Sequence, residues 1–275
     1  MRLTRRGLGR LAMGAGALAG LGTRAGATVP GPFGIAYLEG LAAPGVLPQD
    51  AAFVPPSAVH AAYSHVVYVN TATAGDGRQK MWVLGRTGAA DGDGWALAMS
   101  DAGYWAEQGL LPSYSWPVST GIYYQGDNRS GPTPVGIFNI DERQARHRTG
   151  WGSPGMYKAI YIDLHYNGGR ASGVAIHGTT QNKYRRLGRA DSHGCVRMTQ
   201  ANMDVFWGLF HPDGATGDAS QLWGQVPRYF TSAPETGMDA RSGYVRDGSL
   251  LRAEDGSLLN KDGYRALLVF YRDDL

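Results

Sequence analysis

Short runs of apolar residues, separated by Gly, Asp and Pro, recur along most of this chain. The clearest of these runs lie at 66–69, 80–84, 95–99 and 266–271. Runs of this length between turn residues are typical of β-strands, because helices need a longer pattern with a period of about 3.6 residues. Gly75-Asp76-Gly77, between the first two runs, predicts the turn of a hairpin.

One stretch predicts a helix rather than a strand. Apolar residues recur over 202–210, and Thr199 before them is a residue type that caps helix N-termini. The aromatic-rich region 104–124 is predicted to supply core and cleft-wall side chains, because aromatic residues dominate burial energetics. With 41 glycines and many short apolar runs, the chain is expected to be mostly β, with a few short helices.

The end of the chain predicts further β-structure. Residues 247–251 and 255–259 repeat the pattern Asp-Gly-Ser-Leu-Leu, which is typical of a β-hairpin or meander. A calcium-binding loop is the alternative, but the spaced acidic ligands and final Glu of such loops are missing. The run 266–271 is expected to close the sheet as a buried strand. The segment 212–275 would then pack on or cap the preceding domain, or serve only as a stabilising edge.

Residues 1–27 have the features of an export signal. Arg5 and Arg6 form a twin-arginine pair, a Gly- and Ala-rich apolar stretch follows at 11–22, and 25–27 offers a small-residue cleavage site. Twin-arginine signals direct folded bacterial proteins across the membrane. The chain is therefore predicted to be periplasmic, or tethered at the outer face of the membrane if the signal stays uncleaved.

Composition narrows the classes of function. Residues 28–64 are rich in proline, which predicts an extended lead-in, either linker or strap, with at most one short helix near 56–63. Two further segments follow, at 65–211 and 212–275.

The hydrophobic content of 43% is that of a globular chain, and no apolar run after the signal approaches the ~20 residues of a membrane span. The net charge of +3, without a basic stripe, argues against a nucleic-acid partner.

The single cysteine of the chain, Cys195, lies in the polar stretch 192–197, with His193 two residues before it. Upstream, an apolar run ends at His177, followed by Gly178, which predicts a strand that carries the histidine at its tip. A thiol needs a nearby base to become a nucleophilic thiolate. The alternatives are an inert buried cysteine, and a zinc site made with the two histidines, which would lack a fourth ligand.

These elements together resemble the catalytic signature of the L,D-transpeptidases, the YkuD family. That signature is a histidine, a spacer, then Ser/Thr-His-Gly-Cys, an apolar residue and Asn or Arg; here fourteen residues separate His177 from Ser192. Three more fragments are similar to the family, at 117–121, 133–140 and, more loosely, 154–157. The resemblance covers residues 65–210 and implies that 65–211 is the catalytic domain. The implied fold is a β-sandwich or set of curved mixed sheets, in which a helix follows the cysteine loop.

The resemblance also implies residue roles. Cys195 would be the nucleophile, and His177 the base and acid, oriented by the backbone carbonyl that follows it. His193 would complete the catalytic set by ordering the loop beside the thiol. The oxyanion would be bound by the backbone amides of Gly194 and Cys195, and the loop or substrate would be supported by Ser192, Arg197, Gly178 and Tyr157. For Arg197, binding a substrate carboxylate is an alternative, and Ser192 and Arg197 could instead be plain solvated residues.

The same resemblance implies the reaction. In this family the thiol attacks a peptidoglycan stem peptide, the terminal D-residue leaves, and an amine of a neighbouring stem resolves the thioester. Donor and acceptor stem peptides are thus the expected partners, carbapenem-type β-lactams the expected inhibitors, and no cofactor or metal is expected. The alternatives are a hydrolase of the same fold (carboxypeptidase, cross-link endopeptidase or lipoprotein amidase) and a non-catalytic wall-binding module.

Overall fold

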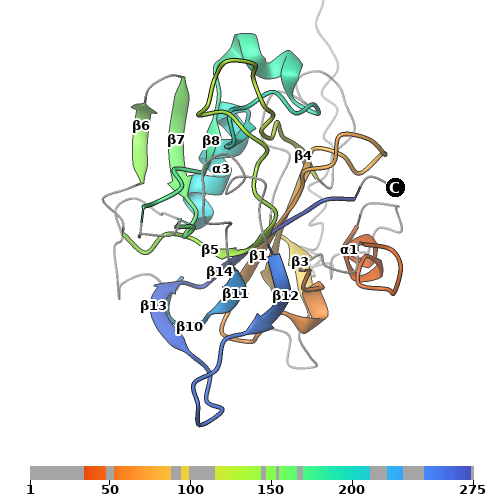
Figure 1. Ribbon diagram of the computed structural model, residues 1–275, viewed down its shortest axis with the longest axis vertical. Coiled ribbons are helices and arrows are strands. Elements are labelled where there is room, and N and C mark those ends of the chain that lie inside the picture. Colours follow the sequence, from red (N-terminus) through yellow and green to blue (C-terminus); the bar gives the residue numbers. More distant parts are fainter. Residues whose placement is uncertain are drawn as a thin grey trace, which may run out of the picture.

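Two β-sheets packed on a shared core organise this protein, as the computed structural model shows (Figure 1). The residues that the structure describes are 34–47, 53–87, 94–98, 115–143, 147–152, 155–165, 170–210, 222–231 and 245–273. The sequence-based prediction of a mostly β fold with few helices and mixed sheets is confirmed. The predicted export signal at 1–27 lies outside the described residues.

The larger sheet, here called the central sheet, contains six strands in the order β3-β2-β1-β14-β5, with β4 paired to β2. These strands are β1 (His65–Asn70), β2 (Lys80–Arg86), β3 (Trp95–Leu97), β4 (Trp116–Pro117), β5 (Gly136–Asn139) and β14 (Ala266–Tyr271). Within this sheet, β1 and β14 pair in parallel, and the other paired strands are antiparallel. The last strand is buried, as expected for 266–271, and it lies inside the sheet, between β1 and β5. The division of the chain at residue 211 stays a prediction.

Both faces of the central sheet are buried, which explains the unbroken apolar runs of its strands. In β1, Val67 and Val69 belong to the core between the sheets, whereas Val66 and Tyr68 belong to a second core on the opposite face. That second core is covered by Leu38 of α1 (Ile35–Gly40) and by residues around η1 (Pro56–Ala58). Helix α1 was not expected in the lead-in, because six residues are too few for a periodic signal and packing on the sheet stabilises it.

The smaller sheet holds the candidate site. It has the order β6-β7-β8-β9, formed by β6 (Arg148–Gly152), β7 (Met156–Tyr161), β8 (Ala175–Gly178) and β9 (Val196–Met198). Strands β8 and β9 run parallel, and η3 (Gln181–Arg186) lies in the connection between them. The predicted helix after the cysteine is α3 (Gln200–Phe210), which packs on β7 and β8. Its predicted cap is confirmed, since Thr199 Oγ1 accepts the Asn202 amide hydrogen at 3.1 Å.

The end of the chain is fastened to both sheets. Strand β10 (Trp223–Pro227) pairs with β13 (Asn260–Tyr264), and β11 (Tyr229–Thr231) pairs with β12 (Val245–Leu250). The predicted hairpin of the two repeats is reduced to a single antiparallel bridge, Arg252 to Leu258, because β12 and β13 take other partners. Asp163, which is almost buried, accepts from Arg228 at 2.7 Å and from Lys261 at 2.6 Å. These two ion pairs connect the end of the chain to the loop after β7.

Candidate active site

His177 is delivered to the site by strand β8, as its apolar run predicted. Ala175 and Ile176 are fully buried, and His177 itself is only 3% exposed. Its Nδ1 lies 2.8 Å from the carbonyl oxygen of Gly178, which is the orienting contact expected for this ring. A carbonyl only accepts, so Nδ1 carries the hydrogen and Nε2 keeps the lone pair. The ring is thus fixed in the tautomer that can take a proton.

Burial also decides the charge of this imidazole. It lowers the pKa of His177 from its ordinary 6.5 to about 4, against the opposing effect of the Gly178 hydrogen bond, and the charge of Arg197 lowers it further. The ring is therefore neutral at neutral pH. The arrangement favours a neutral base that accepts the thiol proton during attack over a preformed pair of thiolate and imidazolium.

Cys195 directly precedes β9, the strand that pairs with the strand of His177. In the parallel pair of β8 and β9, His177 lies opposite Arg197, and the cysteine is two residues before that arginine. The cysteine is partly exposed, and its Sγ lies 3.7 Å from the carbonyl oxygen of Gly173.

The hydroxyl of Ser192 bridges the turn before the thiol. It donates to the carbonyl of Cys195 and accepts the amide hydrogen of Gly194 at 3.1 Å. The prediction that Ser192 supports the loop agrees with these contacts. The Gly194 amide, however, already has a partner, so binding an oxyanion there would require this bond to open. For the amide of Cys195, the oxyanion role stays a prediction.

Arg197 lies along the loop rather than out in solvent, with its side chain 16% exposed. Its Nη1 donates to the carbonyl oxygen of Asp191 at 2.6 Å and lies 3.7 Å from that residue's carboxylate. These contacts favour loop support over the alternative of a solvated polar residue. The same contacts occupy the guanidinium group of Arg197, to which a substrate carboxylate would have to bind in the alternative role.

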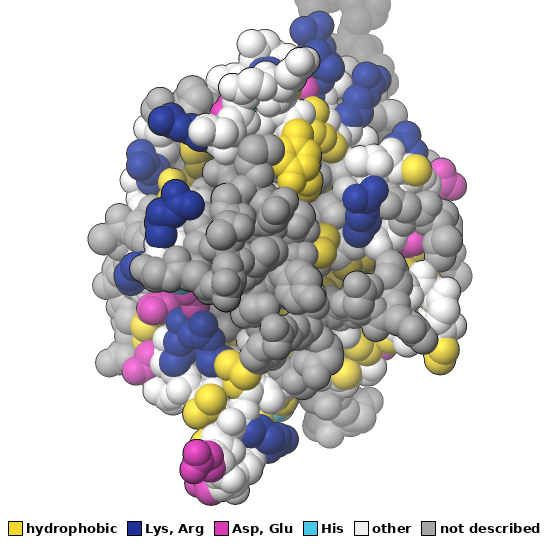
Figure 2. Space-filling view, viewed as in Figure 1, with side chains coloured by type: hydrophobic (Ala, Val, Ile, Leu, Met, Phe, Trp, Pro, Cys, Tyr) yellow, Lys and Arg dark blue, Asp and Glu magenta, His cyan; other side chains and the backbone are white. Residues whose placement is uncertain are grey.

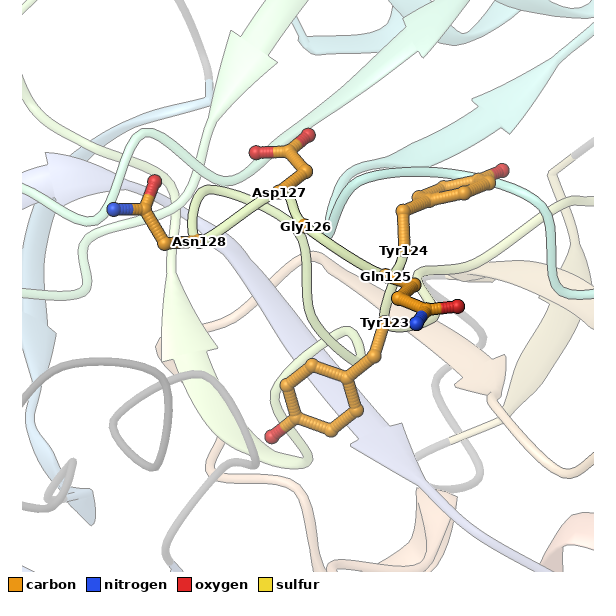
Figure 3. Close-up of a pocket in the computed structure, with 6 residues that line it drawn as sticks. All are labelled: Tyr123, Tyr124, Gln125, Gly126, Asp127 and Asn128. Atoms are coloured by element: carbon orange, nitrogen blue, oxygen red, sulfur yellow. The ribbon is translucent and has the colours of Figure 1, made fainter.

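The side chain of His193 contacts the loop 123–128. Its Nε2 lies 3.2 Å from Asp127 Oδ2, its ring stacks on Tyr124 at a centroid distance of 4.6 Å, and its side chain is 54% exposed. Both partners belong to the loop 123–128, which lines an open pocket of about 490 Å³ (Figure 3). The hydroxyl of Tyr124 donates to the Asp191 carbonyl at 2.8 Å, which joins this loop to the cysteine loop.

The aromatic residues of the region 104–124 divide between core and surface. Trp116 is fully buried, as predicted, and belongs to the core between the sheets. Tyr123 is 46% exposed and points in a different direction from Tyr124 along the pocket wall (Figure 3). Tyr114, a further core candidate, lies outside the described residues.

Tyr157 and Gly178 support the strand of the histidine. They are register partners in β7 and β8, and a Cβ on Gly178 would come 2.9 Å from the Tyr157 ring and 3.2 Å from Met203. The Tyr157 hydroxyl donates to Asp204 on α3 at 2.8 Å. Both residues therefore pack the helix against β8, which fits the supporting role expected of them.

Three buried residues of the site were not in the predicted set. Gln79 is fully buried, and its carboxamide oxygen accepts the Thr120 amide at 2.7 Å. The Thr120 carbonyl accepts the amides of Asp191 and Ser192, each at 2.9 Å. Thr133 Oγ1 donates to the Gly194 carbonyl at 2.9 Å. The fragments 117–121 and 133–140 contain Thr120 and Thr133, but nothing in the sequence indicated that these residues contact the cysteine loop, and no fragment contains Gln79.

The part of the chain that the structure describes contains no group of three or more His, Cys, Asp or Glu side chains that could hold a metal ion. The zinc alternative thus gains no support from this geometry. Within the same residues, no helix has the length and apolar character needed to cross a membrane.

Comparison with known proteins bears on this site. Residues 100–226 match the YkuD family, the L,D-transpeptidase catalytic domain. The matched region contains His177 and the whole cysteine motif, and it supports an L,D-transpeptidase catalytic domain of the YkuD type. It begins later than the predicted boundary at residue 65 and ends beyond 211. No curated protein matches the chain.

Several solved L,D-transpeptidases are similar to parts of the chain. L,D-transpeptidase 3 from Mycobacterium tuberculosis is 12% identical, with 54% of this chain and 57% of that chain covered and a TM-score of 0.30. An L,D-transpeptidase from Mycobacterium smegmatis is 15% identical, with 53% of each chain covered and a TM-score of 0.27. A structure of the first enzyme in complex with a faropenem-derived adduct is 13% identical, with 52% and 54% covered and a TM-score of 0.29. The matched parts span about half the length of these proteins.

Proposed function

We propose that this protein is a peptidoglycan L,D-transpeptidase that cross-links stem peptides through a thioester on Cys195. The observation that carries the proposal is the 2.8 Å hydrogen bond between Nδ1 of the buried His177 and the Gly178 carbonyl, on the strand parallel to the one that follows the cysteine. This bond leaves Nε2 as a proton acceptor. The family match over residues 100–226 supports the same function.

The first half of the reaction is acylation. The thiol of Cys195 gives its proton to Nε2 of His177, and its sulfur forms a bond to the carbonyl carbon that precedes the terminal D-residue. The carbonyl electrons move to oxygen, where the amide of Cys195 stabilises the charge. The C–N bond then breaks, the leaving amine takes the proton from the imidazolium, and a thioester remains.

The second half transfers the acyl group. The side-chain amine of a diaminopimelate on a neighbouring stem attacks the thioester and loses a proton to His177. The C–S bond breaks, the thiolate takes the proton back, and a new peptide bond joins the two stems. A general base works best when its pKa lies near the operating pH, and the lowered pKa of His177 means that the ring starts the reaction neutral and gains its proton only as the thiol attacks.

Surface charge supports an acidic substrate. Stem peptides carry carboxylates, and η3 between the two site strands exposes Lys183, Arg185 and Arg186. Figure 2 shows Lys and Arg side chains along the upper part of one face of the molecule. The open pocket lined by residues 123–128 adjoins His193 and offers space for the stem beside the cysteine loop.

The proposed compartment follows from the twin-arginine segment, Arg5 and Arg6, together with the single cysteine. Export would place the enzyme where peptidoglycan is exposed, and an unpaired thiol avoids a disulfide there when no second cysteine is present. Fractionating cells that express the full chain tests this point. Replacing both arginines by lysine should retain the precursor inside the cell, and unchanged export would overturn the assignment.

Product analysis tests the reaction itself. Purified tetrapeptide muropeptides incubated with the protein should give dimers, detected by mass, with release of the terminal D-residue. Shortened monomers alone would assign a hydrolase, in which water replaces the acceptor amine. No change in any muropeptide would contradict both enzymes and favour a wall-binding module.

A further inference from the structure

The buried hydroxyl of Thr133 is hydrogen-bonded to the peptide unit between Gly194 and Cys195. Thr133 is 3% exposed, and its Oγ1 donates to the carbonyl oxygen of Gly194 at 2.9 Å. The Oγ1 of Thr133 also accepts the amide hydrogen of Gly121 at 2.8 Å. A hydroxyl has one hydrogen to give, so accepting from one backbone group leaves that hydrogen for the other. The direction of the bond toward Gly194 is thereby fixed.

The carbonyl of Gly194 and the amide of Cys195 belong to one peptide unit. No peptide bond among the described residues is cis, so in this planar unit the C=O and the N–H point in opposite directions. Holding the Gly194 oxygen on Thr133 therefore directs the Cys195 amide hydrogen away from Thr133. We infer that Thr133 is a positioning residue, which orients the Cys195 amide for the oxyanion of the proposed reaction.

The need for such a tether comes from glycine. Gly194 has φ +135°, a conformation that glycine adopts readily and other residues rarely do. A glycine at this place lets the chain turn beside the reacting carbon, but it also leaves the following peptide free to rotate. The Gly194 amide is already bonded to Ser192, so the orientation of the next amide decides where oxyanion charge is stabilised.

The tether is itself held on rigid elements. A Cβ on Gly121 would lie 2.6 Å from Gly194 Cα and 2.2 Å from the Gly131 carbonyl oxygen, so the segment after β4 lies in close contact with the turn. Thr120 beside it is bonded through both its amide and its hydroxyl to the buried carboxamide of Gln79, at 2.7 and 2.8 Å. Thr133 therefore acts from a fixed position, as a positioning group must.

The inference rests on the proposed function, and two reactions of the same thiol separate the two claims. Acylation by a carbapenem passes through an oxyanion, whereas alkylation by iodoacetamide does not. Thr133→Val removes the hydroxyl and keeps the shape of the side chain. We expect it to lower the rate constant for carbapenem acylation by about 10²-fold, the low end for loss of an oxyanion donor, and to leave the alkylation rate unchanged. Thr133→Ser keeps the hydroxyl and should restore acylation.

A matched control comes from Thr71, a buried threonine whose hydroxyl donates to the Tyr271 carbonyl at 3.1 Å in the central sheet. Thr71→Val loses a comparable bond and should change neither rate. If Thr133→Val does not fold, Thr133→Ala tests the same hydroxyl with the same two rates.

Each outcome decides one claim. Wild-type protein that is alkylated but never acylated would refute the proposed function. Wild-type and Thr133→Val proteins acylated at equal rates would overturn the positioning role alone. Equal losses of alkylation and acylation in Thr133→Val would also overturn it, because they would show collapse of the whole loop rather than a turned amide.

Discussion

The two histidines near the cysteine are held by different parts of the molecule. His177 is 3% exposed at the end of β8, where a backbone carbonyl of its own strand fixes the ring. His193 has a side chain that is 54% exposed, and a polar contact with Asp127 and a stacked tyrosine from another loop hold it. A rigid, buried ring keeps one tautomer and one position. An exposed ring held by loop contacts orders the loop instead.

This difference assigns the roles. A general base must stay at a fixed place in one tautomer, which the end of β8 provides for His177. The contacts of His193 with Asp127 and Tyr124 join the cysteine loop to the pocket loop 123–128. We therefore propose that His193 orders the loop and that His177 is the base.

The largest expected effect comes from removing the thiol of Cys195. Cys195→Ala should abolish cross-linking of muropeptides, because no other thiol exists in the chain. The fold should survive, since the side chain is partly exposed and small. Dimer formation by mass and thermal unfolding by circular dichroism measure the two effects. A tenth of wild-type turnover in this variant would contradict covalent catalysis.

The next effect separates the two histidines directly. His177→Gln should lower turnover by at least about 10²-fold, the usual loss for a general acid–base group. His193→Gln should be milder, by less than about 10-fold, because it removes one exposed polar contact of the loop. Steady-state turnover with muropeptides checks both values.

The histidine comparison has a matched control. His147 is also buried, and its Nε2 lies 2.9 Å from the Asp141 carbonyl oxygen. His147→Gln removes a buried imidazole outside the site and should keep most of the activity. The reverse order, with His193→Gln the more damaging of the two site variants, would give the base role to His193.

The buried ring should also make stability depend on pH. The pKa of His177 is about 4 in the folded protein and near the ordinary 6.5 when unfolded, so the unfolded chain binds the extra proton between these values. The contribution of His177 to the free energy of unfolding is therefore greatest above pH 6.5, and it falls as the pH falls toward 4. The full change is about 3 kcal/mol in the free energy of unfolding.

Chemical denaturation between pH 4 and 7 measures this slope. His177→Gln should remove most of it, whereas burial lowers the pKa of His65 as well and should leave a smaller slope. A variant with the wild-type slope would show that the His177 ring is not buried in solution as it is here.

The smallest effect concerns the contact that holds His193. Asp127→Asn keeps the shape of the residue but weakens the contact with His193, and such a contact is worth no more than about 1 kcal/mol at an exposed site. Turnover should fall by less than about 5-fold, since 1 kcal/mol corresponds to that factor. Asp255→Asn is the control, because Asp127 and Asp255 both accept the amide two residues on, at 2.8 and 2.9 Å. Equal turnover in both variants would mean that the contact has no role.

The sequence predicted the parts of this fold that local pattern controls. Strands β1, β2 and β8 and helix α3 were expected from apolar runs and a capping threonine, and the ring contact of His177 was expected from the resemblance. The place of β14 was not, because an apolar run shows that a strand is buried but not which strands it lies between. The parallel pairing of β1 with β14 joins residues about two hundred positions apart.

The supporting contacts of the site were the least predictable. Gln79, Thr120 and Thr133 are ordinary polar residues in the sequence, and their roles arise when three separate segments meet at the cysteine loop. Gly121 likewise reads as a turn glycine, although the close approach of Gly194 is what excludes a side chain there. Contacts of this kind depend on tertiary structure and leave no periodic signal.

The formation of a covalent adduct on Cys195 tests the central claim most directly. Carbapenem-type β-lactams contain a strained amide, and the thiolate should open the ring to form a stable thioester. Intact-mass measurement of the full chain should show one adduct per wild-type molecule and none on Cys195→Ala. An adduct that persists in Cys195→Ala, or a wild-type protein that forms none while its thiol remains open to alkylation, would contradict a cysteine acyl-enzyme.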